Sequence, residues 1–488
     1  MKKLLLIVIL VVGFSWMLTS FLFAQTNITG SIVKIYTVYN KHSYSRPWEM
    51  MGQWKLSGSG CIIKGNRILT NAHVVGDYTF IQVKRAGIAK KYIAEVEIVA
   101  HECELAILKV KDKSFFSGAE PLLVGELAEV GDKVATYGFP QGGDELAFTE
   151  GVVSRVEHQT YTHSNANLLS CQIDAAINPG SSGGPVIKEN KIVGVAFEAG
   201  EGKNIGYMVP VPIINHFMKD IEDGKYDGIP GLGFSWQKIE NPDMRLLYRM
   251  SENQSGILLN KIYPDSPAKE ILKAGDVILS VEGKNIANDG TIEFRKNERT
   301  SFEYVIQNKF IDDIVEFEIL RDNKVMNVKI KLSIPINHCK LVSYAQYDIA
   351  PTYCIVGGLV FEPLTLNYLV ESWDPDDAPS YLANYYLYGE SSNTRREVVV
   401  LISILADEIN VGYQDLEDNV ISYVNGEKIS TIKELVKAVE KNKGKYHVFI
   451  DEWGNRIVLD KNKAEERNKI ILERYKINSD RSEDLKKL

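Results

Sequence analysis

Short apolar runs at close spacing dominate the chain from Ile32 to about Val211, and turn-forming Gly, Asn and Asp residues separate them. Runs of this kind, bounded by turn signals, are typical of β-strands, and many of them in succession indicate an antiparallel sandwich or barrel. The region ends with apolar residues at helical spacing and a glycine stop, namely Ile213, Ile214, Phe217, Ile221 and Gly224. We therefore predict a β-rich domain over residues 25–224 that a short helix closes.

The second part of the chain contains a repeat. Residues 275–286 read GDVILSVEGKNI and residues 418–429 read DNVISYVNGEKI, and the two stretches align residue by residue. Each predicts a strand, a tight turn and a second strand, and a repeat of this kind indicates two copies of one domain. We place the first copy at 228–334 and the second at 335–460.

Several local signals fill in these two domains. Asp322 and Asn323 mark the turn of a predicted hairpin, and Thr431 with Glu434 forms a capping box before an apolar helical stripe. Residues 371–397 are polar and Tyr-rich, and they are predicted to form an insertion or loop. Residues 461–488 are charged and are predicted to form a tail that is helical at first and then frayed.

The composition is that of a globular chain, with 45% hydrophobic and 25% charged residues among 488. The formal net charge is −8 and no long basic run occurs, so nucleic-acid binding is not expected. The five cysteines are odd in number and form no CxxC pair, which argues against a disulfide framework. They are predicted to be mostly buried free thiols.

The N-terminus has the pattern of an export signal. Lys2 and Lys3 precede an uncharged run from Leu4 to Phe23, and Ala24 offers a small residue at a cleavage point. Residues 1–24 are therefore predicted to be a secretory signal peptide. The alternative is an uncleaved signal anchor, because the run is long enough to span a bilayer. In both cases the rest of the chain is exported, to the periplasm or another extracytoplasmic space, and in the second case it is membrane-anchored.

Three segments carry residues for nucleophilic catalysis. LTNAHVV contains His73, HECELAILKV contains Glu104 and NPGSSGGP contains Ser182, in the chain order of the chymotrypsin-type triad. A serine hydroxyl needs an adjacent base, a neutral histidine can take its proton, and a carboxylate can fix the tautomer of that histidine. The glycines allow a sharp turn, after which the N–H groups of Gly180 and Ser182 can point together at a developing oxyanion.

Each segment alone has a plainer interpretation. GSSGGP resembles a linker, and His73 after a strand could be structural. HECE resembles a metal cluster, but it lacks two histidines at helical spacing and adjoins an apolar run. Their joint occurrence favours a serine protease, and we predict neither a metal site nor another cofactor.

Taken together, SGSGCIIKGNRILTNAHVV, CELAILKV, INPGSSGGPVI and NIGYMVPVPII resemble segments of the Deg/HtrA family of serine endopeptidases. GIPGLGFSWQKIENPDMR and VVLISILADEINVGYQDL resemble its plant-type Deg branch, so the resemblance covers nearly the whole chain. It implies a mainly β fold with a chymotrypsin-like double β-barrel followed by two PDZ-like α+β domains. It also implies ATP-independent cleavage of unfolded or damaged proteins by a homotrimer or a multiple of trimers.

The resemblance assigns roles to individual residues. His73 is then the general base, Glu104 the orienting acid and Ser182 the nucleophile, with oxyanion donors from Gly180 and Ser182. The pocket for the substrate side chain is then lined by Ile205, Gly206 and Tyr207. The GLGF string resembles the PDZ loop that binds a peptide carboxylate, and it consists of Gly231, Leu232, Gly233 and Phe234.

Two positions depart from the family pattern. Glu104 stands where the family usually has Asp, and Ser181 stands where it commonly has Asn. Because Glu is one methylene longer, its carboxylate must reach His73 from a displaced or folded-back side chain. The sequence therefore leaves two functions open, an active endopeptidase and a weakened or inactive pseudo-protease that acts as a chaperone or peptide-binding scaffold.

Overall fold

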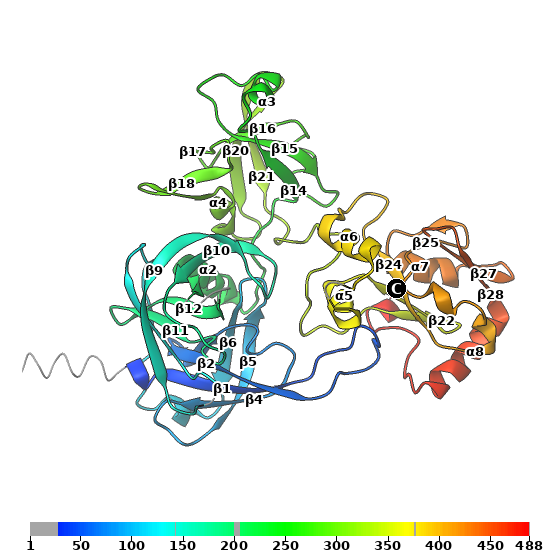
Figure 1. Ribbon diagram of the computed structural model, residues 1–488, viewed down its shortest axis with the longest axis horizontal. Helices are drawn as coiled ribbons and strands as arrows, with labels where there is room; N and C mark the ends of the chain where they lie inside the picture. Colours follow the sequence, from blue (N-terminus) through cyan, green and yellow to red (C-terminus); the bar gives the residue numbers. More distant parts are fainter. Residues whose placement is uncertain (1–27, 142, 200–204, 375–376, 488) are drawn as a thin grey trace, which may run out of the picture. The chain divides into compact units, whose positions relative to one another are not determined.

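A computed structural model describes residues 28–141, 143–199, 205–374 and 377–487. The predicted signal peptide or anchor, residues 1–24, lies outside the described residues. Within the described ranges, no helix combines the length and apolar character needed to cross a membrane. The chain divides into two compact units (Figure 1). The first contains the residues up to Tyr39 with Gln53–Ile229 and Ile292–Ile311, and the second contains Asn40–Gly52, Pro230–Thr291 and Asp312–Leu488.

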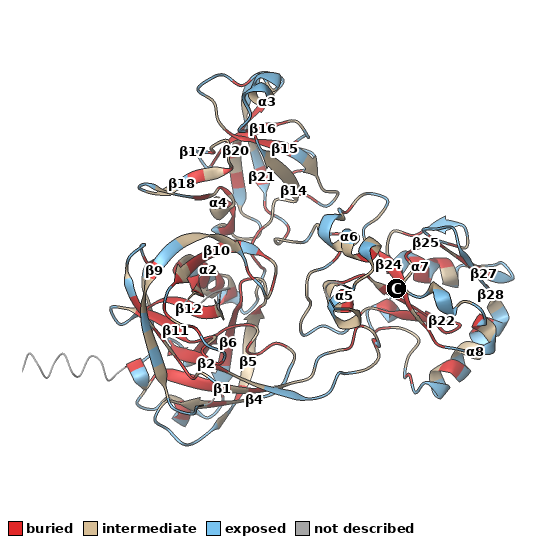
Figure 2. Ribbon diagram, viewed as in Figure 1, coloured by how far each residue is buried: buried red, intermediate tan, exposed pale blue. Residues whose placement is uncertain are grey.

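The first unit begins with a closed antiparallel barrel in the strand order β1-β2-β3-β6-β5-β4. Its strands are β1 (Ile32–Tyr39), β2 (Trp54–Ile63), β3 (Arg67–Thr70), β4 (Tyr78–Arg85), β5 (Tyr92–Ala100) and β6 (Leu105–Val110). The apolar side chains of these strands fill the interior, where Ile35, Ile68 and Leu108 have no exposed surface. Figure 2 shows the buried residues along these strands.

A second barrel follows. The strands run in the order β11-β8-β9-β10-β13-β12, and pairing of β11 with β12 closes the ring. They are β8 (Lys133–Gly138), β9 (Ala147–Thr160), β10 (Asn167–Ile173), β11 (Pro185–Lys188), β12 (Lys191–Ala199) and β13 (Gly206–Pro210), and β7 (Leu123–Val124) joins β12 in parallel. The double-barrel prediction is thereby confirmed. The predicted closing helix is α2 (Val211–Asp220), and Gly224 ends the following turn in a left-handed conformation (φ 91°).

The first predicted PDZ copy forms a sheet in the order β14-β15-β16-β20-β21, with β17 paired to β16. The elements are β14 (Phe234–Lys238), α3 (Pro242–Leu247), β15 (Ile257–Ile262), β16 (Val277–Val281), β17 (Lys284–Asn285), β20 (Ile314–Arg321) and β21 (Lys324–Lys331). The predicted hairpin is β20–β21, whose turn residues Asp322 and Asn323 have φ values of 50° and 62°. Two left-handed residues define the turn type that matches strand twist.

Part of this copy belongs to the first unit. β18 (Thr291–Arg295), β19 (Glu298–Ser301) and α4 (Glu303–Gln307) lie largely in Ile292–Ile311, which packs with the protease barrels. The imidazole of His158, on β9, binds Thr300 Oγ1 at 2.8 Å and Gln307 Oε1 at 2.9 Å. Gln307 Nε2 also donates to the carbonyl of Asn167 at 2.8 Å. No motif in the sequence predicts this attachment.

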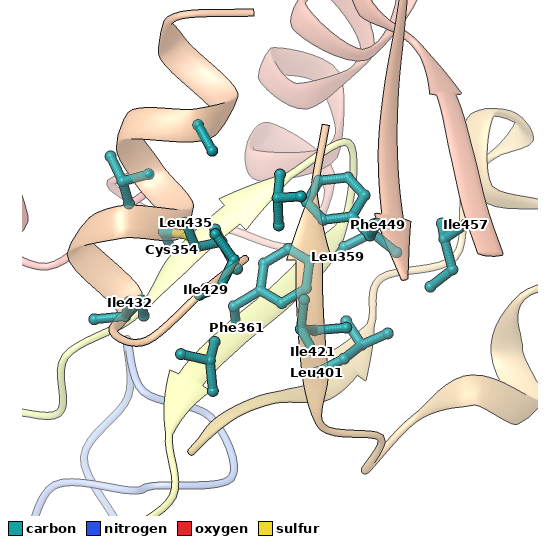
Figure 3. Close-up of a cluster of buried hydrophobic side chains, with 14 of the residues drawn as sticks. Cys354, Leu359, Phe361, Leu401, Ile421, Ile429, Ile432, Leu435, Phe449 and Ile457 are labelled. Carbon is teal, nitrogen blue, oxygen red and sulfur yellow. The ribbon is translucent and has the colours of Figure 1, made fainter. Parts of the chain in front are cut away.

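The second copy contains two sheets, β22-β23-β24 and β26-β25-β27-β28. The strands are β22 (Cys354–Val356), β23 (Leu359–Pro363), β24 (Val399–Ile404), β25 (Ile421–Val424), β26 (Glu427–Lys428), β27 (Tyr446–Asp451) and β28 (Arg456–Asp460). The helix α7 (Ile432–Glu440) begins at Thr431, whose side chain accepts from the N–H of Glu434, which is one half of the predicted capping box. The other half is absent among the described residues, because the Glu434 carboxylate accepts from the N–H of Ser430 instead of that of Thr431. Figure 3 shows the core, in which the rings of Phe361 and Phe449 stack at 5.1 Å and α7 supplies Leu435.

Two expectations about this copy need correction. The Tyr-rich stretch is not merely a loop, because it contains the end of α5 (Leu366–Ser372) and all of α6 (Ser380–Tyr388), with Leu382 fully buried. The charged tail forms α8 (Lys461–Arg474) as predicted, but residues 475–487 are not frayed. Ile477 and Leu485 are 6% and 1% exposed, so apolar residues anchor the C-terminal segment in the core.

The segment Asn40–Gly52, which joins β1 to β2, belongs to the second unit. Tyr44 is 4% exposed and packs in the core of the second PDZ copy. The carboxylate of Glu371 accepts hydrogen bonds from Ser43 Oγ at 2.6 Å, from the N–H of Tyr44 at 2.6 Å and from Ser45 Oγ at 2.7 Å. A protease-barrel connection is thus held by the domain at the other end of the chain.

Candidate active site

His73 and Ser182 line the same cleft, which has a volume of about 310 Å³. His73 follows β3 of the first barrel, and Ser182 lies in the loop before β11 of the second. The remaining lining residues come from both barrels of this unit, and they are Leu56, Ser57, Val74, Gln141, Ile177, Asn178, Pro179 and Gly180. The segments that carry His73 and Ser182 are therefore adjacent in space.

Glu104 reaches His73 despite its longer side chain. One carboxylate oxygen, Oε1, accepts from the backbone N–H of His73 and contacts His73 Nδ1, both at 2.9 Å. Glu104 is fully buried and has a left-handed backbone (φ 63°) in the turn between β5 and β6, which costs a non-glycine residue about 1–2 kcal/mol. Asn71 donates its side-chain amide to the carbonyl of Glu104 at 2.9 Å. The strained turn directs the Glu104 carboxylate toward the His73 imidazole, so the longer side chain still reaches its partner.

The electrostatics of this pair favour an ionised acid beside a basic imidazole. Burial disfavours the charged form of His73, but the charge and hydrogen bond of Glu104 outweigh burial and raise the pKa of His73 above its usual value. Burial likewise opposes ionisation of Glu104, yet His73 and His163 together hold the pKa of Glu104 below its usual range. Glu104 therefore remains a carboxylate when His73 takes up a proton.

The glycines around Ser182 are required by close backbone approach. Gly183 has φ 85°, and a Cβ there would lie 2.2 Å from the carbonyl oxygen of Ser59. A Cβ on Gly184 would lie 2.0 Å from the carbonyl oxygen of Tyr137. Both distances are far inside van der Waals contact, so no side chain fits at either position. The motif is a tightly packed turn rather than a linker.

The peptide groups on either side of Gly180 are fixed by hydrogen bonds. The N–H of Gln141 donates to the carbonyl of Pro179 at 2.7 Å, and Ser59 Oγ donates to the carbonyl of Gly180 at 2.7 Å. Because C=O and N–H point in opposite directions across a trans peptide, the first bond leaves the N–H of Gly180 on the other face. No acceptor within the described part of the chain takes the N–H of Gly180 or of Ser182. Both N–H groups are thus unpaired within the described residues, as the predicted oxyanion role requires.

The Ser182 hydroxyl makes its recorded hydrogen bond to the carbonyl of Phe197, at 3.4 Å, rather than to His73. The bond is long, and in substrate-free enzymes the nucleophile–base bond is commonly long or poorly aligned as well. A rotation about χ1 of Ser182 would turn Oγ away from the carbonyl of Phe197 and toward the cleft, which His73 also lines.

Comparison with known proteins identifies the domains. Residues 58–195 match the trypsin-like peptidase domain, and residues 230–332 and 342–484 each match a PDZ domain. Protease Do-like 2, chloroplastic, of Arabidopsis thaliana is 38% identical over 466 residues, which are 94% of this chain and 76% of the relative. The chain belongs to the Do-like (HtrA/Deg) family of serine proteases. Protease Do-like 4, mitochondrial, of the same plant is 39% identical, over 92% of this chain and 84% of its own.

A solved structure shares the fold of this Do-like protease. The HtrA-type protease AlgW with tripeptide superposes with a TM-score of 0.50 at 23% identity, over 64% of this chain and 95% of its own. The chain is a serine endopeptidase with two PDZ domains, as the family membership and the peptidase domain establish.

The predicted pocket residues are not among the described residues that line the cleft, although Gly206 lies beside one that does. Gly206 begins β13, and a Cβ there would lie 2.7 Å from Cδ1 of Ile177, which does line the cleft. Tyr207 pairs with Gln172 and with Glu198 on the neighbouring strands. Ile205 directly precedes β13. The sequence did not single out Ile177, although it stands within the quoted INPGSSGGPVI segment.

The GLGF loop precedes β14, the edge strand of its sheet, which offers a free edge to an extended peptide. Gly231 donates its N–H to the carbonyl of Ile334 at 2.9 Å, so that donor is already used. The carbonyl of Leu232 accepts from Ser266 Oγ at 2.8 Å, and the carbonyl of Gly233 accepts from the N–H of Tyr263 at 2.9 Å. Within the described residues, the N–H groups of Leu232 and Gly233 have no recorded acceptor, and they are the donors left for a carboxylate. Phe234 begins β14 itself.

Glu102, two residues before the acid, has a different partner. It accepts from the Tyr226 hydroxyl at 2.6 Å and from the N–H of Ile229, and burial raises its pKa to about 7. It thereby ties the end of the protease domain to the turn that carries Glu104. No group of three potential metal ligands occurs in the described ranges, HECE included.

Proposed function

We propose that this chain is an ATP-independent endopeptidase that cleaves unfolded or damaged proteins by an acyl-enzyme mechanism. The observation that carries the mechanism is the pair of 2.9 Å contacts between Glu104 and His73, in a cleft that also contains Ser182. This geometry supports an active enzyme over the inactive scaffold, because the longer acid still reaches the imidazole. The PDZ domains support a substrate that offers an extended or terminal peptide, since such domains add a strand to a sheet edge.

In the proposed reaction, Ser182 Oγ bonds to the carbonyl carbon of the scissile peptide while His73 Nε2 takes the hydroxyl proton. The N–H groups of Gly180 and Ser182 stabilise the oxyanion, at about 3 kcal/mol per donor. His73 then gives its proton to the leaving amine as the C–N bond breaks, which leaves an acyl ester on Ser182. A water molecule, deprotonated by His73, attacks this ester and releases the acid, and the proton returns to Ser182. Glu104 stays ionised throughout and stabilises the imidazolium.

The substrate class can be tested by comparing one protein in two states. We expect the purified enzyme, without ATP, to degrade reduced and carboxymethylated α-lactalbumin at least tenfold faster than the native, disulfide-bonded protein, because only the unfolded chain fits the cleft in extended form. Gel densitometry measures both rates. Equal rates for the two forms would contradict the proposed specificity for unfolded proteins. Absence of both cleavage and fluorophosphonate labelling at Ser182 would contradict the proposed mechanism.

The proposed carboxylate loop predicts a preference for free C-termini. Since a hydrogen bond to a charged group contributes about 1.5–3 kcal/mol, a peptide with a free carboxylate should bind roughly tenfold or more tightly than its amidated form. The measurement is fluorescence anisotropy on the Ser182→Ala protein, which does not consume the peptide. In the matched variant Gly233→Val the preference should disappear, because a Cβ at φ 65° would lie 2.9 Å from Ser266. Equal binding of both peptides contradicts the loop assignment.

We also propose that the chain is exported and assembles into a homotrimer or a multiple of it. The Lys2–Lys3 start and the uncharged run to Phe23 support export with cleavage after Ala24 or retention as an anchor, and resemblance to the family supports a homotrimer or a multiple of it. N-terminal sequencing of the mature protein distinguishes cleavage from anchoring. Light scattering measures the assembly, and a monomer in solution would contradict the trimer.

A further inference from the structure

A second histidine lies on the far side of the catalytic carboxylate. Glu104 Oε1 is occupied by His73, whereas Glu104 Oε2 is buried and has no hydrogen-bond partner within the described residues. The nearest imidazole nitrogen recorded beside Oε2 is Nδ1 of His163, at 3.7 Å. A buried carboxylate oxygen without a donor is costly, and a shift of about 1 Å by either side chain brings this pair to hydrogen-bond length.

His163 is itself held in place. It lies in the turn between β9 and β10, and its side chain is 9% exposed. Its Nε2 pairs with Nδ1 of His101 at 2.9 Å, and the two ring centroids are 5.2 Å apart. With Nε2 engaged by His101, Nδ1 is the nitrogen that faces Glu104. If Nδ1 of His163 carries its proton, Nε2 accepts from His101, and both bonds are satisfied by neutral rings.

The turn that carries His163 is docked on the turn that carries Glu104. Ser164 Oγ donates to the carbonyl of Glu102 at 2.9 Å. Within its own turn, the N–H of Asn165 donates to the carbonyl of Tyr161 at 2.7 Å. A turn of the second barrel thus holds an imidazole against the acid supplied by the first barrel.

We propose that His163 is a positioning residue that donates Nδ1–H to Glu104 Oε2 and so holds the carboxylate with Oε1 toward His73. The inference rests on the proposed triad mechanism. It has a physical reason in the extra methylene, since Glu has one more side-chain torsion than Asp, and contacts with His73 at one oxygen alone leave the carboxylate rotation less restricted. Contacts at both oxygens remove that freedom. His163 transfers no proton in this arrangement.

The test compares two amide replacements of similar polarity in the full-length enzyme. His163→Asn places an amide N–H near the position of Nδ1, whereas His163→Gln places it near that of Nε2, away from Glu104. We expect His163→Gln to lower kcat about 10- to 100-fold at unchanged KM, as a misplacement of about 1 Å does, and His163→Asn to retain most of the activity. The rate of Ser182 labelling by a fluorophosphonate should follow kcat. His216→Gln, a buried histidine outside the cleft, is the control for loss of an imidazole and should leave kcat unchanged.

A double-mutant cycle separates positioning from general loss of structure. If His163 acts through Glu104, His163→Gln should have no further effect on kcat in the Glu104→Ala background. Equal losses in both backgrounds, or equal kcat for the Asn and Gln variants, would overturn the proposal. Wild-type enzyme that neither cleaves nor takes up the label would instead refute the triad mechanism itself, so the two failures are distinguishable. Thermal unfolding of each variant establishes that the compared proteins are folded.

Discussion

Replacement of Ser182 with Ala is expected to lower kcat by about 10⁶-fold, which is the scale of loss when a triad nucleophile is removed. The variant keeps the N–H of residue 182, the Gly180 donor and the packed turn, so binding and oxyanion stabilisation remain while the attacking oxygen is gone. Unfolded-protein cleavage and fluorophosphonate labelling both measure the loss. Thermal stability should change little, because within the described residues the hydroxyl makes one long bond, of 3.4 Å, to the carbonyl of Phe197.

The adjacent serine provides the matched control. Ser181 is 8% exposed, and the hydrogen bonds recorded for it run through its backbone, from its N–H to Asn178 and from Gly184 to its carbonyl. Ser181→Ala removes one hydroxyl from the same turn without touching the cleft lining. It should therefore keep kcat within a few-fold of wild type. Comparable losses in the two serine variants would mean that the turn, and not the Ser182 oxygen, is what the reaction needs.

Local patterns were sufficient to predict the elements that carry the site. The spacing of apolar runs predicted an antiparallel sandwich or barrel, the family resemblance specified two barrels, and the order of His73, Glu104 and Ser182 predicted which segments meet. These features are encoded within each segment, as turn residues, alternation and packed glycines. The repeated turn residues also predicted the two PDZ copies, with Glu282–Gly283 and Asn425–Gly426 left-handed in both.

Features that depend on distant contacts could not be predicted in this way. The Gly180 peptide groups are fixed by hydrogen bonds of Ser59, which stands in the quoted SGSGCIIKGN segment without an assigned role, and of Gln141, which lies outside every motif. The same holds for His163, because only the docking of two turns from different barrels brings it to Glu104. Burial in the Tyr-rich stretch and beyond α8 was not predicted, because both segments are mostly polar. A few well-spaced apolar side chains, such as Leu382 and Leu485, are nevertheless buried there.

Replacement of Glu104 with Gln should lower kcat by about 10⁴-fold, because a neutral amide neither fixes the His73 tautomer nor stabilises the imidazolium. It should also move the acidic limb of the pH profile. His73 must be neutral to act as base, so activity is lost as pH falls through its pKa, and the charge of Glu104 raises that pKa. Without this charge the pKa of His73 falls, and the limb of kcat/KM shifts to lower pH. Stopped-time assays of peptide cleavage across pH 4–9 measure both the rate and the position of the acidic limb.

Glu102→Gln is the control for Glu104, since Glu102 lies in the same turn and is also an acceptor of hydrogen bonds, from Tyr226 and Ile229. It should leave the acidic limb of the pH profile in place.

Glu104→Asp tests whether the longer side chain of Glu104 lowers the rate. The wild-type carboxylate already lies 2.9 Å from His73 Nδ1, so shortening the side chain retracts it by about 1 Å and should cost about 100-fold in kcat. A gain in rate would instead show that Glu104 is a compromised acid, and a limb that does not move in Glu104→Gln would show that another group sets the pKa of His73.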